Sequence, residues 1–130
     1  MFEVRVEADF AAAHFLQDFH GKCERLHGHN YQVFAHARGT DLDEGGMLLD
    51  FGILKKELRS ICKELDHSHL NENEFFENNP SAERIALYIF QKLESALQEY
   101  SPKTAALLYA VDVFETATSR ARYTKDSFFL

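Results

Sequence analysis

The sequence lacks several features that would place it in particular classes of protein. It has only two cysteines, Cys23 and Cys62, which cannot form the disulfide framework of a small secreted domain. No apolar run approaches the ~20 residues that a membrane-spanning helix needs, and the charged, alternating first residues do not resemble a signal peptide. Basic residues are the minority, 14 against 21 acidic ones, so a general nucleic-acid-binding surface is not expected. We therefore expect a cytoplasmic protein that binds neither membranes nor nucleic acids.

Nothing in the composition divides the chain into parts. The 130 residues contain no internal repeat, linker or low-complexity segment, and their number suits one domain. Hydrophobic residues make up 45% of the sequence. A chain of this size buries roughly two-thirds of the surface that its unfolded form exposes, which is enough for a core. We expect one domain over residues 1–130. Its net charge of -7 leaves room for a small anionic substrate held by a local basic cluster.

Hydrophobic periodicity predicts four strands and two helices. Alternation of apolar and charged residues indicates half-buried strands, and apolar residues at helical spacing indicate amphipathic helices. Asn79 and Pro80 suit the N-cap and first position of the second helix, after a polar, asparagine-rich stretch. The predicted strands are residues 2–13, 31–38, 107–116 and 120–124, and the predicted helices are residues 50–65 and Asn79 to near Tyr100.

This order, ββααββ, predicts an α+β fold. Two helices can cover one face of a four-stranded antiparallel sheet, while the other face needs a cover of its own. Cys62 falls on the apolar stripe of the first helix, so we interpret it as a buried, unreactive thiol.

A group of metal-binding residue types follows the first strand. His27 and His29 are two residues apart, so on a strand both imidazoles face the same side, and Gly28 between them allows the backbone to bend. His14 ends the first alternating run, so a neighbouring strand could supply a third imidazole. Three histidines with an open position describe a catalytic zinc site, although an isolated pair of this kind also suits surface histidines. Cys23 could close the site as a fourth ligand, or act beside the metal as a nucleophile or base.

These residues belong to a longer pattern. The run Cys-x-x-x-His-Gly-His-Asn-Tyr at residues 23–31, after Ala-Ala-His at 12–14, resembles the 6-pyruvoyl-tetrahydropterin synthase family. That family includes the bacterial 6-carboxy-tetrahydropterin synthases of queuosine biosynthesis. The resemblance continues in chain order through Leu48-Leu49-Asp50-Phe51, Leu65-Asp66-His67, Asn79-Pro80-Ser81-Ala82-Glu83 and Glu115-Thr116.

The resemblance implies a fold and an assembly. Members of the family share the tunnelling fold, in which three subunits join their sheets into a barrel and two trimers usually stack into a hexamer. The barrel would cover the sheet face that the helices leave open. We therefore expect a homo-hexamer built as a dimer of trimers.

The resemblance also implies roles for the cluster. His14, His27 and His29 match the family's zinc ligands, and zinc lowers the pKa of the substrate's side-chain hydroxyls as a Lewis acid. Cys23 matches the catalytic thiol, whose thiolate can remove a proton from the substrate side chain; the alternative is a fourth zinc ligand. Asp66 and His67 match the acid/base pair, although an Asp-His sequence after a helix is also an ordinary polar loop pair.

Further matches concern the substrate. Glu115 matches the carboxylate that accepts hydrogen bonds from the N–H edge of a pterin. Ser81 stands where the family has a Thr or Ser near the pterin, whereas Ala82 departs from the family pattern. Four basic residues suit either the triphosphate or solvated surface charge: Lys22, Arg25, Arg120 and Arg122. His20, His36 and His69 match no functional position.

The expected reaction is a lyase reaction on 7,8-dihydroneopterin triphosphate. The short spacing between Cys23 and His27 resembles that of the queuosine-pathway enzyme, which cleaves the side chain and yields 6-carboxy-5,6,7,8-tetrahydropterin. Glu24 lies where another branch has a catalytic glutamate and makes 6-hydroxymethyl-7,8-dihydropterin for folate, but it also suits an exposed charge. The alternative products are 6-hydroxymethyl-7,8-dihydropterin and 6-pyruvoyl-tetrahydropterin. An alternative of another class is a non-catalytic zinc- and pterin-binding module. Such a module would use the same histidines but would need none of Cys23, His67 and Glu115.

Overall fold

The alternating stretches of the sequence form a five-stranded sheet in the computed structural model, which describes residues 1–17 and 24–125. Neighbouring strands are antiparallel, except that a two-residue strand pairs in parallel with Ala12 and Ala13 at one edge. In the spatial order β3-β1-β2-β4-β5, the strands are Ser68–His69, Phe2–His14, His27–Gly39, Leu108–Thr116 and Ser119–Thr124. This arrangement confirms the predicted α+β fold.

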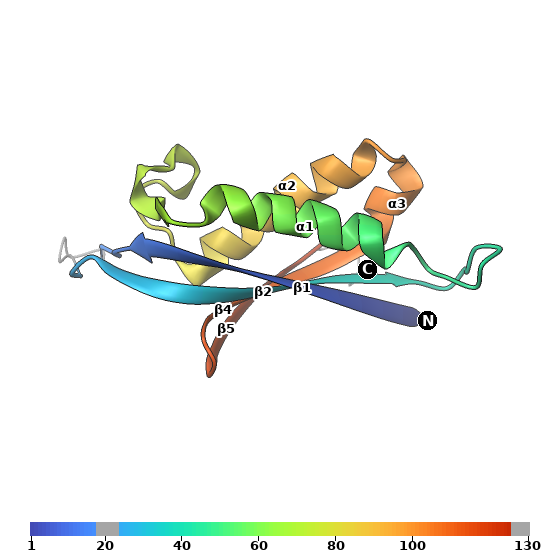
Figure 1. The fold of residues 1–130 in the computed structure, drawn as a ribbon, viewed down its shortest axis with the longest axis horizontal. Coiled ribbons are helices and arrows are strands. Elements are labelled where there is room, and N and C mark those ends of the chain that lie inside the picture. The colour runs from blue at the N-terminus through green and yellow to red at the C-terminus, as the bar shows by residue number, and fades with distance from the viewer. Residues whose placement is uncertain (18–23, 126–130) are drawn as a thin grey trace.

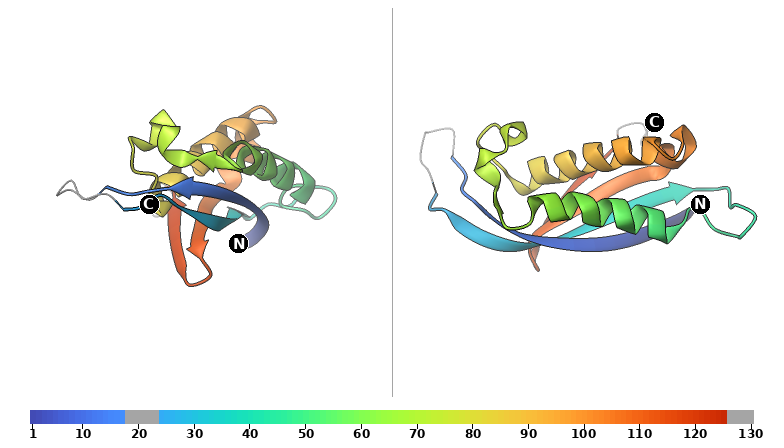
Figure 2. Two further views of the ribbon diagram at one scale, coloured as in Figure 1. Left: turned by 60° about the vertical axis from the view of Figure 1, so that its left-hand side comes forward. Right: turned by 45° about the horizontal axis from the view of Figure 1, so that its top comes forward.

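One face of the sheet is apolar and covered by helices. α1 (Phe51–Leu65), α2 (Ala82–Gln98) and α3 (Pro102–Leu107) all lie on this side, as Figures 1 and 2 show. The predicted apolar stripes of α1 and α2 are buried against the sheet, including Leu58 and Ile89, which are both 0% exposed. None of the described helices is long and apolar enough to cross a membrane.

The register of β1 and β2 determines which side chains meet at the end of the sheet. Phe10 pairs with Tyr31, and their rings stack with centroids 4.7 Å apart in the core. Four residues further along β1, His14 pairs with His27. Because side chains alternate along a strand, His14 and His27 point to the same helix-covered face as Phe10 and Tyr31. The core therefore ends in a layer of imidazoles.

Several element boundaries differ from the sequence prediction. β2 begins at His27 rather than Tyr31, because it pairs with β1 along its whole length. The prediction of Asn79 as N-cap and Pro80 as first residue of α2 is wrong. Ser81 is the N-cap, since its hydroxyl accepts a hydrogen bond from the Arg84 amide, whereas the Asn79 side chain bonds the Gln17 amide.

The chain also contains elements that the periodicity did not reveal. They are all short, and the longest, α3, has six residues. Two others are single 3₁₀ turns, η1 (Leu70–Glu72) and η2 (Glu74–Phe76), and the fourth is β3. A turn or two of helix, or a two-residue strand, is too short to produce a periodic pattern.

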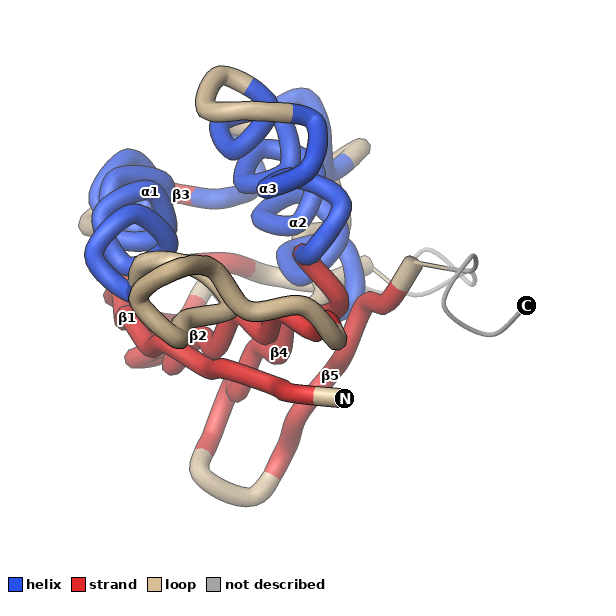
Figure 3. Tube along the Cα trace, turned by 90° about the vertical axis from the view of Figure 1, so that its right-hand side faces the viewer, coloured by secondary structure: helices blue, strands red, loops and turns tan. Residues whose placement is uncertain are grey.

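The helix-free face carries a charged network across three strands, and Figure 3 shows this side of the sheet below the helices. Asp112 of β4 contacts His36 Nε2 of β2 at 2.8 Å and accepts two hydrogen bonds from Arg122 of β5, at 2.7 and 2.9 Å. Asp112 is only 4% exposed. Burial alone would raise the pKa of Asp112, but the bonds from Arg122 and His36 outweigh it and lower that pKa.

Candidate active site

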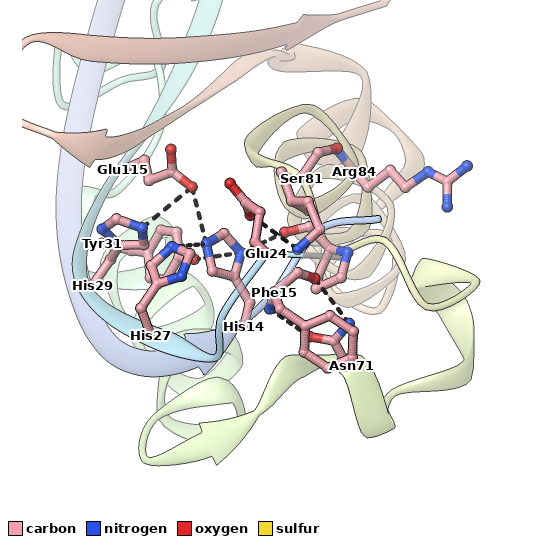
Figure 4. Close-up of polar contacts among 12 residues, drawn as sticks. His14, Phe15, Glu24, His27, His29, Tyr31, Asn71, Ser81, Arg84 and Glu115 are labelled. Carbon is pink, nitrogen blue, oxygen red and sulfur yellow. Dashed lines mark hydrogen bonds and ion pairs between the residues drawn. The ribbon is translucent and has the colours of Figure 1, made fainter. Parts of the chain in front are cut away.

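Three imidazoles converge where β1 ends and β2 begins, as Figure 4 shows. His14, His27 and His29 each offer a ring nitrogen, and these atoms all lie within 4.8 Å of one another. Nε2 of His14 is 3.2 Å from Nε2 of His27. Tetrahedral zinc with Zn–N bonds of about 2.0–2.1 Å places its ligand nitrogens roughly 3.4 Å apart. The spacing therefore fits a metal ion.

Backbone carbonyls determine which ring nitrogens face the cluster. Nδ1 of His14 lies 2.9 Å from the Pro80 carbonyl oxygen, and Nδ1 of His27 lies 2.7 Å from that of Arg25. A carbonyl oxygen can only accept, so both Nδ1 atoms carry a proton, and in the neutral rings both Nε2 atoms present a lone pair. This is how protein metal ligands are usually oriented, and it supports the fit of the three residues to zinc.

A tyrosine of the core contacts the His14 ring. The Tyr31 hydroxyl lies 3.1 Å from Nδ1 of His14, and Tyr31 is fully buried. Burial, together with the charge of Glu115, raises the pKa of Tyr31 above its ordinary value, so the phenol stays protonated. Tyr31 therefore gives His14 a neutral, rigid neighbour.

The asparagine-rich segment after α1 holds the chain just beyond His14. Oδ1 of Asn71 accepts from the Phe15 amide at 2.9 Å, and its Nδ2 donates to the Phe15 carbonyl at 2.9 Å. Oδ1 of Asn79 accepts from the Gln17 amide at 2.7 Å. In the sequence this segment is recognisable only as polar and asparagine-rich, and nothing in it indicates which residues it contacts. The structure shows that it positions the end of β1.

Glu115 joins the cluster from β4. Its Oε1 lies 3.2 Å from Nε2 of His14 and 3.6 Å from Nε2 of His29. Burial lowers the pKa of His29, and the attraction of Glu115 opposes that effect only in part. His29 is therefore neutral at neutral pH, as a metal ligand must be.

Glu24 stands next to the cluster on the chain that leads into β2 (Figure 4). Its amide donates to the Leu16 carbonyl at 2.9 Å, and its Oε1 accepts from the Leu16 amide at 3.0 Å. Its charge also acts on His29, where it opposes the lowering of the pKa. Cys23, the predicted catalytic thiol, lies outside the described residues, as do His20 and Lys22.

The predicted acid/base pair lies at the free edge of β1. Asp66 accepts from the Ala11 amide at 2.8 Å and contacts Nδ1 of His67 at 2.8 Å. These contacts, with the Ala11 amide first, lower the pKa of Asp66. His67 is 84% exposed and lines a shallow hollow of about 390 Å³ whose lining also includes His29 of the triad. Within the described residues, no hydrogen bond, ion pair or ring contact joins His67 to the triad.

The structure gives contacts for other predicted residues as well. The Ser81 hydroxyl caps α2, one residue after the carbonyl that holds His14. Arg122 is bound to Asp112, and Arg120 lies 3.8 Å from the same carboxylate, both on the helix-free face. Cys62 is buried as predicted, and burial, followed by the charges of nearby carboxylates, raises its pKa to about 12.

Known proteins resemble the chain over nearly its whole length. A model of the 6-pyruvoyl tetrahydropterin synthase family matches residues 3–126. A 6-carboxy-5,6,7,8-tetrahydropterin synthase of Synechocystis sp. is 41% identical over 128 residues, which cover 95% of this chain and 93% of that protein.

Solved structures agree with this similarity. The 6-pyruvoyl tetrahydropterin synthase of Caenorhabditis elegans matches with a TM-score of 0.81 at 30% identity and covers 96% of both chains. A Plasmodium vivax 6-pyruvoyltetrahydropterin synthase, in which a catalytic glutamate is replaced by alanine, matches with a TM-score of 0.79 at 27% identity. That match covers 95% of this chain and 97% of the other.

Proposed function

Since the chain belongs to the 6-pyruvoyl tetrahydropterin synthase family, we propose that it is a zinc-dependent lyase that forms 6-carboxy-5,6,7,8-tetrahydropterin. Its substrate would be 7,8-dihydroneopterin triphosphate, whose side chain is cleaved, and its product would serve queuosine synthesis. The observation that carries this proposal is the convergence of three imidazoles and the Glu115 carboxylate at one end of the sheet. The similarity to the Synechocystis enzyme supports the choice of product.

The metal would be held by His14, His27 and His29, whose ring nitrogens already face one another. When bound, zinc supplies Lewis-acid chemistry that lowers the pKa of substrate hydroxyls. The Glu115 carboxylate would accept hydrogen bonds from the amino and ring N–H groups of the pterin, because it offers two acceptor oxygens near the metal.

Proton transfer would be divided between two groups. Cys23, as the thiolate, would remove a proton from the substrate side chain. Asp66 holds Nδ1 of His67, so Nε2 of that ring is free to give or take a proton. The high exposure of His67 supports a role at a surface that another molecule covers.

Glu24 supports a second candidate reaction, formation of 6-hydroxymethyl-7,8-dihydropterin. Its carboxylate lies near the imidazoles, and the similar Plasmodium vivax protein has a catalytic glutamate. A thiolate and a carboxylate differ in basicity, so they can take different protons from one substrate and commit it to different cleavages.

Product analysis tests both reactions. Zinc-loaded protein is incubated with dihydroneopterin triphosphate, and the pterins are separated by chromatography. We expect Cys23→Ala to abolish the carboxy product and spare any hydroxymethyl product, and Glu24→Ala to do the reverse. Cys62→Ala is the matched control, because it removes the other thiol of the chain, which is buried in the helix-covered core, and should leave the products unchanged.

Two results would overturn the assignments. Full-rate formation of the carboxy product by Cys23→Ala would exclude the thiol as the base. Tight pterin binding without any turnover by the zinc-loaded wild type would instead favour a non-catalytic binding module.

A further inference from the structure

The Glu115 carboxylate occupies the place of a fourth metal ligand. We infer that in the substrate-free protein Glu115 coordinates the metal held by the three histidines, and that it must leave the metal to anchor a pterin. The inference rests on the proposed function for the identity of the pterin, but its first half concerns the metal alone.

The contacts of Glu115 are confined to the cluster. Its Oε1 lies 3.2 and 3.6 Å from Nε2 of His14 and His29, close to the 3.2 Å that separates the Nε2 atoms of His14 and His27. Within residues 1–17 and 24–125, the carboxylate has no other hydrogen bond or ion pair. Carboxylate oxygens bind zinc at distances similar to those of imidazole nitrogens, so Oε1 lies at ligand-to-ligand distance from two of the three histidines, His14 and His29.

The protons in the cluster point to a cation at its centre. Because Nδ1 of His14 and of His27 donates to a carbonyl, Nε2 of each ring presents a lone pair to its neighbours. Oε1 of Glu115 also presents lone pairs. Acceptors facing one another at 3.2 Å repel unless a positive charge lies between them. A metal ion satisfies all of them at once.

The alternation of β4 places Glu115 at the site. Val111 and Val113 point into the helix-covered core, and Glu115 follows them at the next alternate position. The register between β4 and β5 shifts between Phe114 and Thr116, so Glu115 is also the extra residue of a β-bulge, a feature that is frequent beside active sites. Its side chain points towards His14, as Figure 4 shows.

Sharing one carboxylate between two ligands links their affinities. A pterin that takes Glu115 removes a ligand from the metal, and the metal makes Glu115 less available to the pterin. Coupling between two bound ligands is reciprocal, so each lowers the affinity of the other by the same factor. A true substrate compensates the metal for the loss of Glu115, because the substrate's side-chain hydroxyls can bind the metal where Glu115 was bound.

Zinc affinity, measured by competition with a chromophoric chelator, tests the coordination. We expect Glu115→Gln to bind zinc at least about tenfold more weakly than wild type, a loss of the size that removal of an outer partner already causes. Glu24→Gln is the matched control: it removes the same charge near His29, but its carboxylate is bound to the Leu16 amide. It should bind zinc within about twofold of wild type.

Either of two outcomes would overturn the coordination. One is unchanged zinc affinity in Glu115→Gln, and the other is an equal loss in Glu24→Gln, which would mean a general effect of charge. The zinc-affinity measurement needs no turnover, so these outcomes leave the proposed reaction intact. Wild-type protein that binds no zinc would instead refute the proposed function itself.

A pterin without a side chain tests the exchange. At saturation it should lower the zinc affinity of wild type, because it binds the Glu115 carboxylate and supplies no ligand to the metal. In Glu115→Gln it should have no effect. Unchanged or tighter zinc binding by the wild type in the presence of this pterin would refute the exchange.

Discussion

His14 is the most constrained residue of the site. It is 1% exposed, its Nδ1 is bonded to the Pro80 carbonyl, and the Tyr31 hydroxyl lies 3.1 Å from the same atom. Its ring therefore has one orientation, with Nε2 towards the other histidines. A ligand held in place before the metal arrives loses little conformational entropy on binding, which favours a tight site.

Replacing two of the three imidazoles tests the metal site. We expect a His27→Ala, His29→Ala double variant to purify without zinc, because one histidine cannot hold the ion. Elemental analysis of metal per chain measures this. His67→Ala is the control and should retain the zinc of the wild type. Full zinc occupancy in the double variant would show that the metal binds elsewhere in the chain.

His67 offers a test of the chemistry that leaves the metal untouched. Its side chain is 84% exposed and, among the residues that the structure describes, forms a hydrogen bond only with Asp66, so His67→Ala should fold and bind zinc normally. We expect its turnover to fall by roughly a hundredfold or more, the usual contribution of a general acid or base. Near-normal turnover would remove His67 from the mechanism.

The sequence could predict the triad but not its surroundings. The spacing of His27 and His29 places both on one strand face, and His14 ends the neighbouring alternating run. The partners of these rings are carbonyls of Pro80 and Arg25, which any residue could supply, so no side-chain pattern indicates them. The Pro80 contact also depends on how a loop folds back on His14 over 66 residues of sequence, whereas Arg25 is two residues from His27.

β2, β4 and β5 are joined on the helix-free face by the network around Asp112. His36 comes from β2 and Arg122 from β5, and Asp112 lies between them on β4. The network links the hairpin that carries Glu115 to the strand that carries the histidines. It therefore fixes the position of β4 relative to β2.

Removing Arg122 should weaken the sheet. We expect Arg122→Met to lower the free energy of unfolding by about 3 kcal/mol at pH 7, because it leaves a buried carboxylate without its main partner. Arg120→Met is the control: Arg120 is 47% exposed and 3.8 Å from Asp112, so its loss should cost at most about 1 kcal/mol. Urea denaturation measures both.

The network around Asp112 also predicts how the stability of the protein changes at acidic pH. The folded state lowers the pKa of Asp112, so its contribution is complete above the ordinary carboxyl pKa of about 4 and is lost as the pH falls through the lower folded value. The difference in stability between wild type and Arg122→Met should therefore narrow below about pH 4. A difference that stays constant into acid would mean that Asp112 is not the partner that matters.

The long helices and strands were predictable from the sequence, but the residues at which they begin and end were harder to predict. Strict alternation located β1, and the apolar stripe located α1 to within a residue. The start of α2 was wrong by two residues because three consecutive residues, Asn79, Pro80 and Ser81, all suit a helix start. Tertiary contacts decided between them: Asn79 and Pro80 are used to hold the segment around His14.

In the whole molecule, both edges of the sheet are incomplete. β3 covers only Ala12 and Ala13 of β1, and within the described part of the chain the outer side of β5 pairs with no strand. Open strand edges tend to pair with other chains. This agrees with the expected barrel of three chains and the hexamer of two such barrels.

Light scattering after size-exclusion chromatography tests the assembly, and we expect a mass of about six chains. If neighbouring chains complete each other's sites, His67 of one chain can serve the triad of the next. Coexpression of His67→Ala with the His27→Ala, His29→Ala chain should then restore part of the activity that each lacks alone. A monomer with full activity would contradict both expectations.

The asparagine contacts at the end of β1 have a consequence for how the site can change. Asn71 and Asn79 hold the backbone of Phe15 and Gln17, and Pro80 holds the ring of His14. Substitutions at the two asparagines would loosen this segment and so alter how fast the protein releases its metal, with every ligand retained. In variants or in design, retention of the proposed metal can thus be tuned through two asparagines that are not among its proposed ligands.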